Sequence, residues 1–398
     1  MFLAPKTRSL SLLTLAVIAA LSLWFVSAAI LPEMLAEHPI TPVRQALLSS
    51  AVQVGFVIGA LASAVLGLPD RLHPGRLFAA CAALAALVNA ALLILPIGGT
   101  GAILARVATG ALLAGVYPVG MKIAVGWGLR DRGFLVGLLV GAVTLGSALP
   151  HVIALGGGAD WRATVLIASA ASLIAAGLAP AVRLGPHHAT SPRFDPAVIR
   201  RAWTDRRIRL AYAGYFGHMW ELYAMWTWAG VAMAAAFVPV LGEGEGLALA
   251  RIVTFAAIAL GGLGCIVGGW FADRIGKDTV AIIALAVSFA SAIAAALCFG
   301  GPVWLLAAIF LLWGASIIPD SPQFSALVAD FAPPEQAGSL MTLQTAIGFA
   351  LTFVTVQAAP VIAEHSGWAV LLALLALGPA AGLIAMLRLR RLSRTKEI

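Results

Sequence analysis

The stretch Gly269-Trp270-Phe271-Ala272-Asp273-Arg274-Ile275-Gly276-Lys277-Asp278 is a compact charged turn that follows a long apolar run. An earlier, imperfect copy reads Gly67-Leu68-Pro69-Asp70-Arg71-Leu72-His73-Pro74-Gly75-Arg76. The Asp-Arg pairs of the two copies begin at positions 70 and 273, which is close to half of the 398 residues apart. The repeat predicts a chain made of two duplicated halves.

The physical role of such a turn follows from its composition. Small glycines let two helices approach closely, and an Asp-Arg pair at a membrane boundary can pair internally or with a neighbouring helix end. The turn would then lock two helices on one face of a membrane. The alternative is a charged loop that only keeps two helices from leaving the bilayer. Two copies at half-chain spacing favour the lock.

These residues resemble the signature loop of the major facilitator superfamily, Gly-x-x-x-Asp-Arg-x-Gly-Arg/Lys, which joins helices 2 and 3 and recurs in weaker form between helices 8 and 9. The residues that would form this cytoplasmic gate motif are Gly67, Asp70, Arg71, Gly75, Arg76, Gly269, Asp273, Arg274, Gly276 and Lys277. The first copy departs from the pattern, because Pro69 precedes Asp70 and one extra residue precedes Gly75. The resemblance implies an all-α membrane protein with about twelve helices in two pseudo-symmetric six-helix bundles. It identifies a superfamily and no substrate.

Composition excludes a soluble globular protein. Hydrophobic residues make up 61% of the chain, charged residues only 11%, and the mean hydropathy is +0.99, whereas an ordinary soluble domain is roughly a quarter charged. The net charge of +8 comes from basic residues scattered between apolar runs, which the positive-inside rule explains without a nucleic-acid partner. The three cysteines lack metal-ligand spacing, and we expect no cofactor.

Apolar runs long enough to span a bilayer predict about twelve helices. They fall near residues 10–30, 45–66, 77–96, 101–127, 134–155, 163–184, 208–238, 247–271, 279–299, 303–327, 338–363 and 367–388. The first run is better read as a helix than as a secretion signal, because it is long enough to span and more spans follow. We therefore predict a first bundle over 1–184, a linker over 185–207, and a second bundle with a basic tail over 208–398.

Charge distribution predicts the orientation. An even number of spans places both termini on one side, and most of the 25 Lys and Arg residues lie in the termini and in connections on that side. The positive-inside rule then makes it the cytoplasmic side of a bacterial-type inner membrane. The basic linker is expected to rest against anionic lipid. We expect the chain to function as a monomer.

Four ionisable residues other than histidine remain inside the predicted spans, namely Arg106, Lys122, Glu221 and Asp320. Each is costly at membrane depth, so each is expected to face a cavity or a partner. Arg106 opens a run with Gly110, Gly115 and Pro118 that is similar to the helix-4 motif of the superfamily, and the resemblance implies a role in proton coupling. The alternative is that Arg106 extends to the interface.

Lys122 lies near the cytoplasmic end of helix 4, and Asp320 lies in the corresponding region of helix 10. The resemblance implies that both helices line a central cavity, so the two side chains could meet across the halves and hold one face closed. Alternatively, Lys122 extends to the membrane boundary.

The predicted span with the most candidate site residues is helix 7. His218, Glu221, Met225 and Trp228 share one helical face by their spacing. An acid beside a histidine in a low-dielectric cavity suits reversible protonation at neutral pH, so Glu221 is the first candidate for proton coupling or substrate contact. The alternative is a buried acid that bonds Tyr or Trp for packing. Tyr223 and Trp226 offer stacking surface, although aromatic residues in spans also serve packing or anchoring.

His151 follows Pro150 in helix 5, after three spaced glycines. This is reminiscent of the helix-5 motif of drug/proton antiporters, but the Gly-Pro pair and the final double glycine of that motif are missing. His151 is a candidate for lining a pathway, and a purely structural histidine is the alternative.

We therefore predict a secondary transporter that moves a small solute by alternating access, coupled to protons. No Walker motif is present, which disfavours ATP as the energy source. A small organic or inorganic anion is the expected substrate. The alternatives are a drug/proton antiporter or efflux pump, copper or other metal uptake through His218 and the nearby methionines, and a membrane-embedded enzyme or sensor, for which no His-Glu-x-x-His signature exists.

Overall fold

The computed structural model describes residues 4–128, 132–156, 160–188 and 198–394, and within them the chain is helical with no strand. Twelve of its helical segments are long and apolar enough to cross a membrane. A bilayer requires this result, because each unpaired backbone group in hydrocarbon costs several kcal/mol and a helix satisfies its own. The predicted all-α fold with about twelve spans is confirmed.

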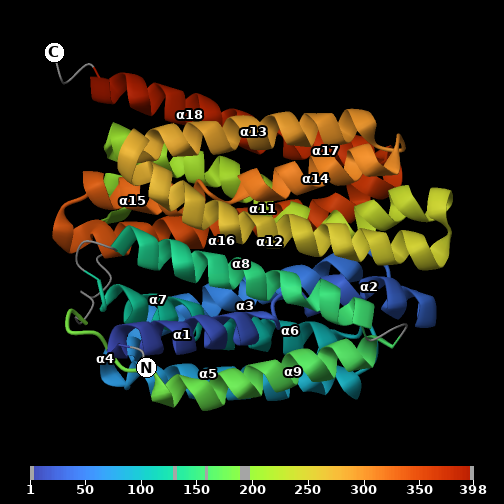
Figure 1. Ribbon diagram of the computed structural model, residues 1–398, viewed down its shortest axis with the longest axis horizontal. Coiled ribbons are helices and arrows are strands. Elements are labelled where there is room, and N and C mark those ends of the chain that lie inside the picture. Colours follow the sequence, from blue (N-terminus) through green and yellow to red (C-terminus); the bar gives the residue numbers. More distant parts are fainter. Residues whose placement is uncertain (1–3, 129–131, 157–159, 189–197, 395–398) are drawn as a thin grey trace.

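The twelve spans form two bundles, which Figure 1 shows as a blue-green set and a yellow-red set. The first bundle contains α1 (Pro5–Leu21) with α2 (Val26–Glu37), α3 (Pro42–Leu66), α5 (Pro74–Ala90), α6 (Thr100–Leu113) with α7 (Tyr117–Val125), α8 (Arg132–Gly156) and α9 (Trp161–Leu178). The second contains α11 (Arg206–Leu241), α12 (Glu243–Ile275), α13 (Lys277–Cys298), α14 (Val303–Ile317) with α15 (Ser321–Phe331), α16 (Pro334–Ser366), and α17 (Trp368–Leu375) with α18 (Leu377–Arg394). Two short helices, α4 (Leu68–Arg71) and α10 (Val198–Thr204), lie in connections.

The two bundles meet along two helix pairs, α8 with α12 and α3 with α16. Figure 1 shows α8 and α12 side by side at the boundary between the colours. Glycine allows this approach: a Cβ added at Gly141 would lie 3.1 Å from the carbonyl oxygen of Gly262, and one added at Gly262 would lie 3.1 Å from that of Gly141. The glycines therefore allow the backbones of α8 and α12 to pack closely at the boundary between the bundles.

Four of the described spans contain a break between two helical segments. Helix 1 breaks at residues 22–25, helix 4 at 114–116, helix 10 at 318–320 and helix 12 at Ala376. A break frees backbone carbonyls that need new donors inside the protein. These breaks place polar backbone and the side chains of Trp24 and Asp320 at membrane depth.

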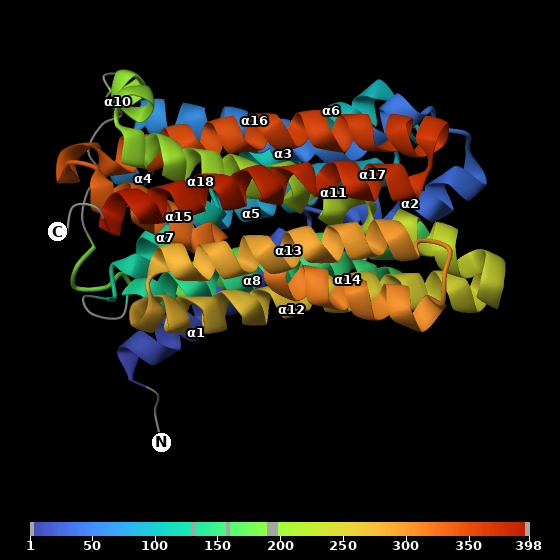
Figure 2. The ribbon, with the colours of Figure 1, turned by 90° about the horizontal axis from the view of Figure 1, so that it is seen from above.

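Both termini lie at the same end of the bundle, together with α4 and α15 (Figures 1 and 2). We call the opposite end the outer end, in keeping with the predicted orientation. The motif turns lie at the terminal end, where Gly67 and Gly276 have φ angles of 61° and 92° that favour glycine. The predicted linker falls partly on residues 189–197, which lie outside the described residues.

Candidate functional site

Glu221 lies at mid-span in α11 and is completely buried. Its carboxylate accepts a hydrogen bond of 2.8 Å from the hydroxyl of Ser288 in α13 and one of 3.0 Å from the indole nitrogen of Trp313 in α14. The three side chains close a triangle, since Trp313 also donates to Ser288 at 3.1 Å. Both partners are neutral and belong to the second bundle, so the acid faces the interior of its own bundle.

His218 lies one helical turn before Glu221 and is also completely buried. Its Nδ1 lies 2.9 Å from Oδ1 of Asp320, which is 1% exposed and sits at the break of helix 10. Asp320 thus faces His218 within its own bundle, and a pair between Lys122 and Asp320 stays a prediction. Lys122 occupies the last turn of α7 and is half-buried.

The shared face predicted for α11 is present and points mainly into the second bundle, although Trp228 also lines a cavity with Pro42 and Gln45 of α3. Met225 and Trp228 pack with Phe310 of α14 and Trp368 of α17 around a cavity of only about 10 Å³. Trp228 also donates a 3.1 Å hydrogen bond to the carbonyl of Val356 in α16. Glu221 and Asp320 thus form a buried acid cluster behind the surface that meets the first bundle.

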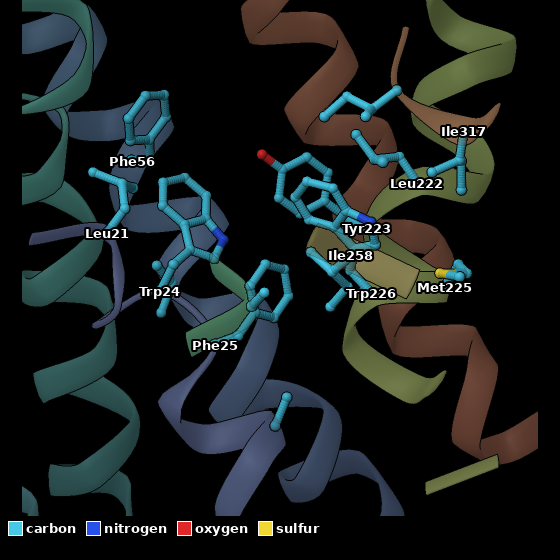
Figure 3. Close-up of a cluster of buried hydrophobic side chains, with 14 of the residues drawn as sticks. Leu21, Trp24, Phe25, Phe56, Leu222, Tyr223, Met225, Trp226, Ile258 and Ile317 are labelled. Carbon is cyan, nitrogen blue, oxygen red and sulfur yellow. The ribbon is translucent and has the colours of Figure 1, made fainter. Parts of the chain in front are cut away.

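Tyr223 and Trp226 lie on a different face of α11, and they turn toward the first bundle (Figure 3). They belong to an aromatic layer that consists of Trp24, Phe25 and Phe56 from the first bundle and Tyr223, Trp226 and Phe349 from the second. All six residues are at most 8% exposed. The layer lies at the break of helix 1 and fills the middle of the boundary between the bundles.

A buried ion pair crosses between the bundles toward the outer end. The Arg251 guanidinium of α12 contacts the Glu33 carboxylate of α2, and its Nη1 lies 3.4 Å from the carbonyl oxygen of Ala154 in α8. A second cross-bundle bond, from Gln357 Nε2 in α16 to Ser50 Oγ in α3, measures 2.6 Å. We call these four side chains the outer latch. Sequence reasoning missed Glu33, because the predicted first span ended at residue 30.

Arg106 is completely buried in α6, so the alternative that it extends to the interface is wrong. Its guanidinium donates to Leu23 O at 2.8 Å, Trp24 O at 2.7 Å and Asn89 Oδ1 at 2.8 Å. The first two acceptors are carbonyls at the break of helix 1. Arg106 therefore stabilises this break, and its predicted coupling role remains a prediction.

His151 is 1% exposed and lies in α8 directly after Pro150. A Cβ added at Gly230 of α11 would lie 3.6 Å from the His151 ring and 3.7 Å from the hydroxyl of Thr254 in α12. The ring therefore faces the second bundle, on the outer side of the aromatic layer. Its role in a pathway remains a prediction.

In the second motif copy, contacts stay within the second bundle. The Arg274 guanidinium stacks 3.5 Å from the centre of the Trp270 ring, and Lys277 Nζ lies 2.5 Å from Oδ2 of Asp330 at the end of α15. In the first copy, the side chain of Asp70 lies outside the described part of the structure, while Arg71 and Arg76 are exposed. Locking of the gate by these residues remains a prediction.

Metal binding has little support from the geometry. Across the described ranges, no three His, Cys, Asp or Glu side chains come together as a metal site. Met219 lies against Gly348 of α16, whereas Met225 lines the small apolar cavity next to α14 and α17. The methionines of helix 7 thus face different neighbours and do not converge on His218.

Comparison with known proteins agrees with this architecture. The solved structure of a mutant of the nucleoside transporter NupG is similar, with a TM-score of 0.72 and 14% identity over 97% of this chain and 100% of that one. No curated protein sequence gives a significant match. The family model of the Major Facilitator Superfamily matches residues 12–354. With its two six-helix bundles, the chain belongs to the Major Facilitator Superfamily.

Proposed function

We propose that this protein is a secondary active transporter that moves a small solute by alternating access and is coupled to protons. The observation that carries the proposal is the carboxylate of Glu221, which is fully buried and receives hydrogen bonds from two neutral donors, Ser288 and Trp313. A charged carboxylate at membrane depth is costly without a cation. Taking up a proton removes this cost, so the site suits reversible protonation.

The neighbouring contact of His218 with Asp320 gives the cluster a second proton-binding group. A carboxylate and an imidazole 2.9 Å apart can share a proton. Glu221 belongs to helix 7 and Asp320 to helix 10, which breaks at Asp320. A change of charge here would alter how α11 packs against α14 and α15, which is the movement that a rocking bundle needs.

The outer latch fits the alternating-access part of the proposal. Its two links join α2 to α12 and α3 to α16, so they close the outer end and must part before that end opens. The basic residues near both termini support a cytoplasmic location for the terminal end. We propose a bacterial-type cytoplasmic membrane and a monomeric transporter.

The contacts of Arg106 bear on whether the substrate is the expected small anion. A small anion would need a free cation, but Arg106 donates to two carbonyls and an amide oxygen. The similar solved structure is that of a nucleoside transporter, and a nucleoside-like solute is therefore a second candidate. At 14% identity this likeness concerns the fold.

A two-stage experiment tests the proposal. Thermal-shift screening of metabolites with the purified protein identifies a ligand, and uptake of that ligand into proteoliposomes is then driven by an imposed pH gradient. We expect Glu221→Gln to abolish gradient-driven uptake while energy-independent exchange of the ligand persists. Glu245→Gln, at an exposed position at the start of α12, is the matched control. Unaltered pH-driven uptake by a folded Glu221→Gln variant would remove Glu221 from the coupling role.

A further inference from the structure

The aromatic layer joins the two bundles through pairs of rings. Trp24 lies 5.9 Å from both Tyr223 and Phe349, measured between ring centres. Phe25 lies 6.0 Å from Tyr223 in a stacked arrangement and 5.9 Å from Trp226 edge to face. Phe56 lies 5.0 Å from Phe349. Every ring of the layer therefore has a partner in the opposite bundle.

Alternating access must break these pairs. When one bundle rocks away from the other, rings that now touch across the boundary separate and expose their faces at mid-membrane. Exposed aromatic faces lose both burial and ring-ring contact, each of which is favourable. A flat ring that enters between them would restore contact on both sides.

The layer also holds two buried donors without an acceptor. The indole nitrogens of Trp24 and Trp226 have no hydrogen-bond partner, although these residues are only 3% and 1% exposed. Buried indole N–H groups usually find an acceptor. Figure 3 shows the Trp24 nitrogen on the side of the ring that faces the second bundle, and the hydroxyl of Tyr223 directed back toward the first bundle. Two polar atoms thus point into the boundary between the rings.

None of the six residues of the layer is charged. The guanidinium of Arg106 contacts the backbone of this layer: it donates a 2.7 Å hydrogen bond to the carbonyl oxygen of Trp24. The acid cluster lies on the opposite side of α11, since Glu221 bonds Ser288 and Trp313. The layer therefore favours stacking and neutral hydrogen bonds over binding of an ion.

From this arrangement we propose that the aromatic layer is the substrate site, and that the substrate is an uncharged flat heterocycle with hydrogen-bond acceptors on its edge. The inference rests on the proposed transport function and narrows its substrate class. The faces of the heterocycle stack between Trp24 or Phe25 and Tyr223 or Trp226. Its edge accepts the hydrogen bond that the Trp24 indole N–H lacks. Stacking on aromatic side chains tolerates different rings, so several related heterocycles would bind.

Binding to the purified protein in nanodiscs tests this directly, with uracil and hypoxanthine as probes. We expect at least one probe to bind. For uracil, 5,6-dihydrouracil is the non-aromatic comparator and orotate the charged one, and both should bind at least about fivefold more weakly. Failure of both probes to bind, or stronger binding of orotate than of uracil, would overturn the proposal.

Substitutions test the location of the site. Trp24→Phe keeps a ring and removes the N–H, so we expect about fivefold weaker binding from one lost neutral hydrogen bond. Trp226→Leu removes a ring and should weaken binding about tenfold. Trp304→Leu, at a 72% exposed position in α14, is the matched control and should bind as the parent does. Equal binding by the parent, Trp24→Phe and Trp226→Leu would place the site elsewhere.

Flux measurements separate this proposal from the transport proposal. If a probe binds through the aromatic layer but never crosses a proteoliposome membrane, transport fails and the site stands. If the screened and transported solute is a sugar or an inorganic ion that is insensitive to Trp226→Leu, transport stands and the aromatic site fails.

Discussion

Glu33→Gln should open the outer end of the protein. Glu33 and Arg251 are 8% and 7% exposed, and their contact joins α2 of the first bundle to α12 of the second. The substitution keeps the size of the side chain and removes its negative charge. In the proposed alternating access the contact exists only while the outer end is closed, so its loss destabilises the closed state relative to the open state.

The expected magnitude follows from the environment of the pair. Removing one partner of a buried ion pair costs about 3–5 kcal/mol. Here the loss should be smaller, because glutamine still offers an acceptor and Arg251 keeps the carbonyl of Ala154 at 3.4 Å. We expect about 2 kcal/mol, which is about a 30-fold shift in the ratio of outer-open to outer-closed molecules.

Cysteine accessibility measures this shift. Gly230 faces His151 and Thr254 at the boundary between the bundles, and a Cβ there meets its neighbours at 3.6 Å or more, so Gly230→Cys is accommodated. With Cys81, Cys265 and Cys298 replaced by alanine, the labelling rate of Cys at position 230 by a membrane-impermeant maleimide reports the open fraction. We expect Glu33→Gln to raise that rate by at least about tenfold.

Glu37→Gln is the matched control. Glu37 lies one turn further along α2 and pairs with Arg162 of α9 at 2.8 Å, entirely within the first bundle. Its loss should leave the labelling rate unchanged. Equal rates for the parent, Glu33→Gln and Glu37→Gln, with all three proteins folded, would refute the outer latch. Restoration of the parent rate by the swapped pair Glu33→Arg with Arg251→Glu would support a direct contact.

Three further predictions concern the interior of the bundles. Arg106→Ala should lower the free energy of unfolding by about 3 kcal/mol, because three buried acceptors lose their donor. The control Arg44→Ala, at an exposed position with one hydrogen bond to the carbonyl oxygen of Gly98, should change it by less than about 1 kcal/mol. Chemical denaturation in micelles compares the two variants, and equal losses would contradict the role of Arg106 at the helix-1 break. Gly314→Ala should lower the melting temperature, since its Cβ would lie 2.1 Å from the carbonyl oxygen of Ala257. The Cβ of the control Gly177→Ala meets nothing within 4 Å, so this variant should keep the melting temperature of the parent. Thermal unfolding measures both, and a Gly314→Ala protein as stable as the parent would argue against the close approach of α12 and α14. His218→Gln and Asp320→Asn should be non-additive by about 0.5–3 kcal/mol in a double-mutant cycle on the free energy of unfolding, because the two side chains touch at 2.9 Å; strictly additive effects would mean that the contact contributes nothing.

The fold was predictable from sequence because the bilayer leaves few choices. Apolar runs of about twenty residues must be helices, and the repeated Asp-Arg turn indicated two related halves. The interruption of helix 1 was not predictable. Residues 22–25 read Ser-Leu-Trp-Phe and contain no glycine or proline, and the donors for the freed carbonyls come from Arg106, more than 80 residues away. Such a break depends on tertiary contacts that no local pattern records.

The candidate site was predictable in its acids and not in their partners. Glu221 and Asp320 stood out because ionisable side chains are rare in spans. Ser288 and Trp313, which bind Glu221, carry no such signal in an apolar run. Lys122 was matched to Asp320 by symmetry of position, yet His218 on the adjacent helix is the actual contact. Symmetry locates a depth in the membrane, whereas helix rotation decides which side chains meet.

The geometry of α11 connects the acid cluster to the aromatic layer. On one face, Glu221 is bound to α13 and α14, and His218 to the break of helix 10. On another face, Tyr223 and Trp226 touch Phe25 of the first bundle. In the proposed mechanism, a proton that changes the charge of the acid cluster changes the packing of α11 against its own bundle, and α11 carries that change to the rings on its other face. Under this proposal, proton and substrate need no direct contact, because both act on the position of the same helix.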